Sequence, residues 1–363
     1  YTFADAATAE AGTSFMYPTS TGFGFTSTGI GANSSGDTFI YMAIRRSHKP
    51  PEAATEVFDV GLRSGSSSDA KTNSDIFTDM TFILRRNSSS EYNGIASRII
   101  GRYSLKTSNS DNDNSGWLDT NAPWGYSTGA MVNGGNGASN TGNLIDFSFK
   151  RAPGFFDVVA YTGTSSVTTV DHNLEAVPEL ILLKGREDIY NWSVYTQTLG
   201  RDKVLYLNED EAASDFTAPA FWGSTDFTDT QFSLGTYWNT NRSGYRYVAY
   251  LFASLSGISK VGTYSGTGNN IDVDCGFTAG ARFVLIKRTD GSSGASGIGN
   301  WYVWNTASGI ASGNDPYMVL DETNAEVTNT DYIDPLNAGF TVTSSAPAAI
   351  NANGGTYLFL AIA

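Results

Sequence analysis

Histidine and charged side chains are scarce in this chain of 363 residues. Charged residues make up 16% of it, and histidine occurs only as His48 and His172. Histidine is the side chain that most often carries protons near neutral pH. His48 lies in a Pro-rich linker and His172 in an Asp-His-Asn turn, so we expect both at the surface. We therefore expect neither a Ser-His-Asp or Cys-His catalytic site nor an enzyme.

Cysteine and long apolar runs are also nearly missing. Cys275 is the only cysteine, which excludes an intrachain disulfide, and its strand-like surroundings predict a small buried side chain. A loop-rich chain without disulfides is typical of folding in a reducing compartment. No apolar run reaches about 18 residues, and residues 1–20 lack the basic start and apolar core of a signal peptide. We therefore expect no membrane insertion.

Positive charge is in short supply relative to negative charge. Lys and Arg number 22 against 36 Asp and Glu, which gives a formal net charge of -14. A surface of that sign repels phosphate backbones and anionic lipid headgroups. Nucleic acid and membranes are therefore not expected as partners.

Aromatic residues, glycine and small polar residues are what the chain does contain. Aromatics make up 13% and glycine occurs 39 times. Flat rings pack well on a pleated surface, whereas strong helix formers are few here. The composition predicts an all-β protein, and the length allows two or three domains.

The sequence also repeats itself. The segment around Tyr161 matches the segment around Tyr264, and three further matches follow in the same order. These matches join residues 178–186 to 281–289, 190–195 to 299–304, and 203–209 to 316–322. An apolar closing strand, preceded each time by a Gly/Asn/Ser-rich turn, is predicted four times, at residues 38–46, 143–151, 245–253 and 356–363.

These matches predict tandem antiparallel β-sandwich modules of about 100 residues. The boundaries are residues 1–46 for the C-terminal part of a first module, 57–151 for a divergent module, and 155–253 and 259–363 for two further modules. We expect each module to have its own core. The last closing strand alternates so that both of its faces are apolar, and we expect both to be covered.

One loop has the spacing of a calcium site. Asp111, Asp113, Ser115 and Asp119 place oxygen atoms at intervals around a glycine, as in a calcium-binding loop. The twelfth position, where a bidentate Glu is expected, is Ala122. The alternative is a simple turn without a cofactor.

The sequence predicts a structural or binding role for four of the seven tryptophans. Trp192 and Trp301 occupy matching positions of the repeat and are predicted core residues. Trp222 and Trp238 flank turn-like segments and are candidates for stacking on sugar rings, although core packing is the favoured interpretation for both. The acidic run at residues 208–215 leaves a polysaccharide hydrolase open as an alternative function, because such enzymes need two carboxyl groups.

Four segments resemble a repeat found in structural proteins of tailed phages, many of them from marine hosts. They are residues 41–51, 275–288, 331–342 and 355–363. The resemblance implies a virion protein, such as a tail fibre or other appendage, assembled in the host cytoplasm. The implied partners are other copies of itself, neighbouring virion proteins and a host surface glycan or protein. A capsid-decorating or head-fibre protein is the alternative position, because phages reuse β modules on heads and tails.

Overall fold

The structure of the protein is a computed structural model. It describes residues 16–18, 23–25, 34–43, 48–63, 74–87, 93–101, 103–113, 143–217, 219–290 and 299–363. Residues Tyr1–Ser47 form one unit and His48–Ala363 another. Each unit is described by itself.

The first unit contains a short antiparallel pair, β1 (Met16–Pro18) and β2 (Phe23–Phe25). Residues 38–43 form no strand, and the side chains of Ile40, Tyr41 and Met42 are exposed. The closing strand predicted at residues 38–46 is therefore wrong for the part that the structure describes. The other closing strands lie between two partner strands, whereas residues 38–43 have no partner strand in the described part of the chain.

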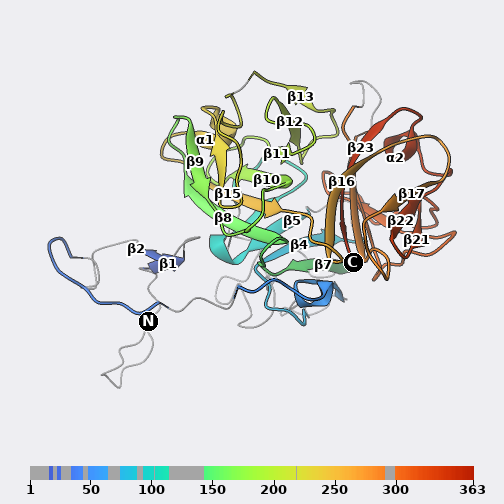
Figure 1. Cartoon of the computed structure of the whole chain (residues 1–363), viewed down its shortest axis with the longest axis horizontal. Coiled ribbons are helices and arrows are strands. Elements are labelled where there is room, and N and C mark those ends of the chain that lie inside the picture. The colour runs from blue at the N-terminus through green and yellow to red at the C-terminus, as the bar shows by residue number, and fades with distance from the viewer. Residues whose placement is uncertain are drawn as a thin grey trace. The chain divides into compact units, whose positions relative to one another are not determined.

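The second unit confirms the prediction of a nearly all-β protein (Figure 1). Its first sheet has the order β3 (Phe58–Arg63), β7 (Leu144–Phe149), β4 (Met80–Arg85), β5 (Gly94–Ser97) and β6 (Ser104–Lys106). Its second sheet has the order β8 (Phe156–Thr162), β15 (Arg246–Phe252), β10 (Leu180–Gly185), β11 (Ser193–Thr196), β12 (Lys203–Tyr206) and β13 (Ser214–Asp215). Its third sheet has the order β16 (Ser259–Ser265), β23 (Thr356–Ile362), β18 (Phe283–Arg288), β19 (Trp301–Asn305) and β20 (Tyr317–Val319).

Smaller elements cover the outer faces of the second and third sheets. β9 (Thr168–Asp171) pairs with β14 (Gln231–Leu234), and β22 (Gly339–Val342) lies between β17 (Ile271–Asp274) and β21 (Ile333–Leu336). The short helices are η1 (Ala54–Glu56), η2 (Arg98–Ile100), α1 (Trp238–Asn241) and α2 (Ala348–Asn351).

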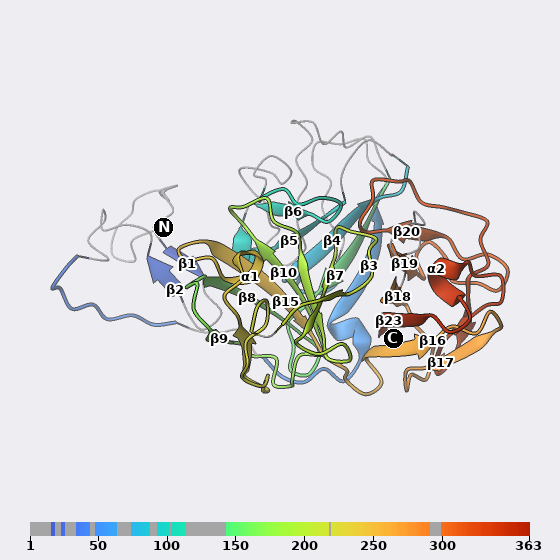
Figure 2. The ribbon, with the colours of Figure 1, turned by 90° about the horizontal axis from the view of Figure 1, so that it is seen from above.

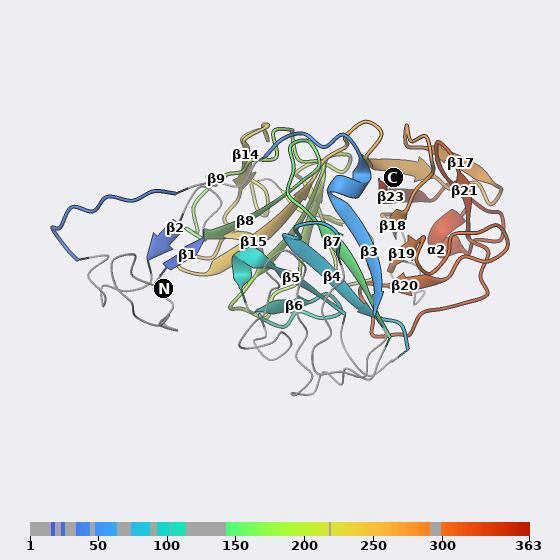
Figure 3. The ribbon, with the colours of Figure 1, turned by 90° about the horizontal axis from the view of Figure 1, so that it is seen from below.

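The three large sheets share one strand order and one register. In each of them the strand that comes first in the chain pairs with the closing strand, which pairs in turn with the next strand in the chain. Met80, Leu180 and Phe283 occupy the same position, because they pair with the corresponding residues of β5, β11 and β19. Figures 2 and 3 show the first sheet beside the second and the third.

A single core joins the inner faces of all three sheets. Phe149 of the first sheet, Phe252 of the second and Leu360 of the third belong to one continuous cluster of buried residues. The outer faces of the second and third sheets pack against their own small sheets in two separate clusters. The prediction of an independent core for each module is therefore wrong for the inner faces. An apolar face of a strand has the same sequence pattern whether it is covered by its own module or by a neighbouring one. The sequence therefore does not show which module covers the inner face.

Two tryptophans connect neighbouring sheets inside this core. Trp192 donates from Nε1 to the backbone carbonyl of Lys106 in β6, at 2.8 Å. Trp301 donates in the same way to the carbonyl of Tyr206 in β12, at 2.9 Å. Both indole rings are fully buried, which confirms the prediction that they are core residues. Each ring thus links its own sheet to the preceding one.

A third hydrogen bond joins the first sheet to the third sheet. Asn93 stands four residues before the end of β5, as Trp192 does in β11 and Trp301 in β19. Its side-chain amide donates to the carbonyl of Val319 in β20, at 2.9 Å. The first sheet is thereby tied to the third, and the three hydrogen bonds form an interior ring around the shared core.

A second set of contacts follows the same cycle. Backbone N–H groups donate across each boundary at 2.9–3.0 Å, from Asp113 to Arg186, from Ala213 to Thr289 and from Glu326 to Arg86. Side-chain ion pairs reinforce two of these boundaries, with 2.9 Å between Arg186 and Asp113 and 2.8 Å between Arg86 and Glu326. The cyclic pattern relates the sheets by an approximate threefold symmetry.

The strand that ends the chain is central to this arrangement. β23 pairs with β16 on one side and with β18 on the other. Leu358, Leu360 and Ile362 face the shared core, whereas Tyr357 and Phe359 face the outer cluster of the third sheet. The prediction that both faces are covered is confirmed.

Deleting residues 358–363 should therefore unfold all of residues 48–363 rather than the third sheet alone. The deletion removes three side chains from the shared core, and the loss of one buried Leu typically costs about 2–5 kcal/mol. Limited proteolysis followed by mass spectrometry measures the outcome, with deletion of Ala363 alone as the matched control. A fragment of residues 155–253 that stays as resistant as in the full chain would contradict the shared core.

Candidate functional site

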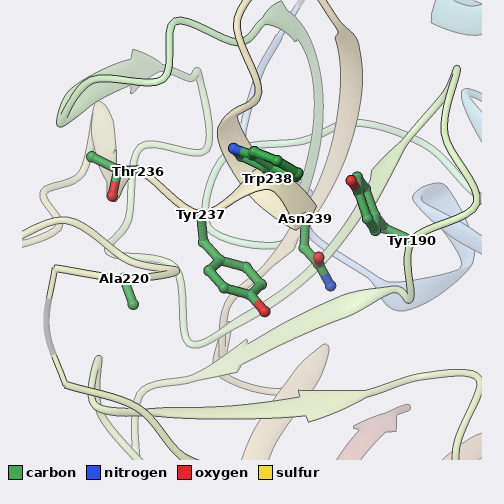
Figure 4. Close-up of a pocket in the computed structure, with 6 residues that line it drawn as sticks. All are labelled: Tyr190, Ala220, Thr236, Tyr237, Trp238 and Asn239. Atoms are coloured by element: carbon green, nitrogen blue, oxygen red, sulfur yellow. The ribbon is translucent and has the colours of Figure 1, made fainter.

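A pocket of about 230 Å³ opens beside α1 at the second sheet. Its lining residues come from the segment before β11 and from the segments around β14 and α1, and they are Tyr190, Ala220, Thr236, Tyr237, Trp238 and Asn239. Figure 4 shows the Asn239 side chain between Tyr190 and Tyr237, with the indole of Trp238 above it. Three aromatic rings and one amide thus surround a small hollow.

The backbone beneath the pocket is held by buried and partly buried hydrogen bonds. The Tyr247 hydroxyl in β15 donates to the carbonyl of Trp238 at 2.6 Å and accepts from the N–H of Arg242 at 2.8 Å. The amide of Asn241 donates to the carbonyls of Gly235 and Ser166, both at 2.7 Å. Buried hydrogen-bond networks of this kind keep a turn in one conformation.

Gly235 has a steric requirement at the entrance to this turn. A Cβ atom there would lie 1.9 Å from the carbonyl oxygen of Pro219 and 2.0 Å from that of Ala220. Only glycine allows the backbone to approach so closely. The segment that carries Tyr237 and Trp238 is thereby pressed against the loop that carries Ala220.

Two rings of the pocket are widely exposed, whereas the residue that carries the amide is largely covered. Trp238 is 57% exposed and Tyr237 is 42% exposed, but Asn239 is only 9% exposed. The Arg242 guanidinium lies 5.4 Å from the centre of the Trp238 ring and pairs with Asp188 at 2.5 Å. The cation beside the pocket is therefore neutralised by its own partner.

The same turn occurs in the third sheet with a different surface. The Tyr357 hydroxyl donates to the carbonyl of Ala348 and accepts from the N–H of Ala352, both at 2.7 Å, as Tyr247 does in the second sheet. These bonds align α2 with α1. The positions of Tyr237, Trp238 and Asn239 are taken in the third sheet by Pro347, Ala348 and Ala349.

The structure separates the two tryptophans that are candidates for sugar stacking. Trp238 lines the pocket, whereas Trp222 is fully buried and donates from Nε1 to the carbonyl of Lys203 at 3.3 Å. Sugar stacking is therefore wrong for Trp222, and the favoured interpretation of core packing is confirmed, because its ring is buried in the outer cluster of the second sheet. Sequence reasoning missed Tyr190, Tyr237 and Asn239. The available signal was the change from Tyr-Trp-Asn to Pro-Ala-Ala between two matching turns.

Two carboxylates of the predicted calcium loop, those of Asp111 and Asp113, are engaged by cations. Lys106 donates to Asp111 at 2.6 Å, and this hydrogen bond lowers the pKa of Asp111. Asp113 pairs with Arg186, yet burial raises its pKa. Ser115 and Asp119 lie outside the described residues. Within the described ranges no group of three or more His, Cys, Asp or Glu side chains is placed to hold a metal ion.

The two histidines have different surroundings. His172 is buried, stacks on Phe232 and accepts a hydrogen bond at Nδ1 from the N–H of Leu174 at 3.2 Å. The expectation of a surface position is therefore wrong for His172, and burial lowers its pKa. His48 is partly buried, and its Nε2 lies 2.7 Å from the carbonyl of Asn173. Cys275 is buried as predicted, and this burial raises its pKa to about 12.

A family model described as "Domain of unknown function (DUF7483)" matches residues 87–363. The chain belongs to this family. The matched region contains the whole second and third sheets, the pocket and all three donors of the interior ring. No curated protein matches the chain. None of the helices in the described ranges is long and apolar enough to cross a membrane.

Two buried lysines of the family region add contacts across the sheet boundaries. Lys184 donates to the carbonyl of Ser110 in the loop after β6, at 3.1 Å. Lys287 donates to the carbonyl of Glu209 in the loop after β12, at 3.1 Å. Both ammonium groups lie in the interior, and burial lowers the pKa of each to about 8.

The pKa of Lys184 predicts a pH dependence of stability. Between about pH 8 and pH 10.5 the unfolded chain binds more protons at this lysine than the folded chain, so the free energy of unfolding rises with pH. Lys184→Met should make this rise smaller, because only Lys287 then contributes to it. Urea unfolding between about pH 7.5 and 9.5 measures the slope. Lys49→Met, at a lysine whose side chain is 62% exposed, is the control and should keep the original slope. An unchanged slope in Lys184→Met would contradict a lowered pKa of Lys184 in the folded chain.

Proposed function

We propose that the chain is a non-catalytic structural protein of a tailed-phage particle, exposed on a tail fibre or another appendage and used in host attachment. The resemblance of residues 41–51, 275–288, 331–342 and 355–363 to phage structural repeats suggests the particle. Membership of a family of unknown function neither adds an activity nor names a partner. The physical support for a structural role comes from the arrangement of the three sheets around their shared core.

The proposal includes an architecture of repeated modules. The three large sheets have the same strand order and register, and the second and third each carry a small outer sheet. This supports antiparallel β-sandwich modules of about 100 residues, with the boundaries 57–151, 155–253 and 259–363. The short linkers between the modules hold neighbouring modules close together.

The interior ring is the single observation that carries the structural role. The donors Asn93, Trp192 and Trp301 tie each sheet to the next and the first sheet back to the third. Such a closed arrangement has no terminal module from which unfolding can begin, unlike an open row of repeats. A body of this kind keeps its outer loops in place outside the cell. Contacts with further copies and with neighbouring virion proteins would then use its outer surfaces.

The pocket supports binding rather than cleavage. Glycoside hydrolases place two carboxyl groups across the sugar, and the six residues that line the pocket include no Asp or Glu. The acidic run at residues 208–215 lies elsewhere, with the carbonyl of Glu209 bound by Lys287. Loops that bind without chemistry are a common feature of rigid β scaffolds.

Immunogold labelling of purified particles tests this proposal. Antibodies raised against the purified chain should place gold on the tail fibres or appendages in negative-stain images. Antibody that has first been absorbed with the chain is the control and should give no label. Label confined to the capsid would replace attachment by head decoration, and particles without label would contradict a virion role.

A further inference from the structure

We infer that the pocket beside α1 binds one uncharged pyranose ring of a surface glycan. This inference rests on the proposed attachment function and adds a ligand class and the residues that recognise it. Trp238, Tyr237 and Tyr190 would supply the stacking surfaces, and Asn239 would supply the hydrogen bonds.

The exposed rings have the form of a stacking platform. Trp238 and Tyr237 leave about half of their surface in water, although burial of large aromatic rings is a main source of stability elsewhere in this fold. The face of an aromatic ring carries partial negative charge, and the C–H groups on one face of a pyranose carry partial positive charge. A sugar can therefore lie flat on such a ring while its hydroxyl groups point to the walls of the pocket.

Asn239 provides an independent indication of a polar ligand. Its side chain is more than nine-tenths buried and faces the pocket, yet no described group of the protein hydrogen-bonds it. Its amide atoms still reach the solvent in the pocket, so a ligand would replace water as their hydrogen-bond partner. Asn241, two residues later, shows the contrast, because its amide donates to two carbonyls and accepts from the N–H of Thr164. Sugar hydroxyl groups can both donate to Asn239 and accept from it.

The third sheet shows that these side chains are not needed for folding. Its equivalent turn keeps the tyrosine hydroxyl bonds and the Asn351 bonds but carries Pro347, Ala348 and Ala349. The scaffold therefore forms without aromatic residues and without the amide. Trp238→Ala and Asn239→Ala put the residues of the third sheet on the same backbone and should fold.

Charge and size indicate a neutral sugar unit. No lining residue is charged, and Arg242 beside the pocket is paired with Asp188. The chain has a net charge of -14, which disfavours acidic sugars. The volume of about 230 Å³ is below the range of about 300–1,000 Å³ that drug-sized ligands occupy. One ring of a longer glycan fits these limits.

Saturation-transfer NMR on the purified full chain tests the inference. The probes are the methyl β-glycosides of glucose, galactose and N-acetylglucosamine, with methyl α-sialoside as the acidic comparison. At least one neutral glycoside should bind with a Kd in the millimolar range, and the acidic glycoside should bind more weakly. Trp238→Ala should weaken binding by about tenfold or more, as removal of a stacking ring does elsewhere, and Asn239→Ala by about fivefold.

Tyr41→Ala is the matched control, because it removes an exposed aromatic ring outside the pocket. This variant should bind like the unaltered chain. The inference is overturned if no neutral glycoside binds, if only the acidic glycoside binds, or if folded Trp238→Ala binds as well as Tyr41→Ala. None of these results affects the immunogold outcome, so failure of the sugar site and failure of the virion role are distinguishable.

Discussion

The interior ring is the constraint on which the rest of the structure depends. Each of its hydrogen bonds contributes only about 0.5–1.5 kcal/mol net, but a buried donor or acceptor without its partner costs about 1–3 kcal/mol. The carbonyls of Lys106 and Val319 belong to the edge strands β6 and β20, and Tyr206 lies beyond the two residues of β12 that pair with β13. The donors from the next sheet therefore complete these carbonyls. The ring therefore sets the distance between the sheets, and the shared core fills the space between them.

The inner faces of the sheets and the outer turns are under different constraints, which explains why the outer turns can vary in sequence. The inner faces must match two other sheets at once, whereas α1 and α2 need only keep the hydrogen bonds of Tyr247 and Tyr357. Above those bonds the second sheet carries Trp238 and the third carries Ala348. A rigid inside with exchangeable turns is a common way for a β protein to place a binding site.

Much of the fold could be predicted from the sequence, because the internal matches locate equivalent strands and the alternation in residues 356–363 shows which side chains share a face. The shared core could not be predicted, since apolar alternation is the same whether a face packs within a module or between modules. Asn93 was missed because an amide replaces the indole of Trp192 and Trp301. Trp222 and Trp238 both lie beside turns, and only the tertiary structure shows that one is buried and the other lines a pocket with Tyr190.

Native-state hydrogen exchange at rising denaturant tests the closed three-sheet body most directly. The central strands β7, β15 and β23 lie in different sheets but in one core, so their slowest amides should converge on one opening free energy, within about 1 kcal/mol. That result would show that the sheets unfold together. A plateau for one of the three strands that lies several kcal/mol below the other two would show that its sheet opens alone, and would contradict the account.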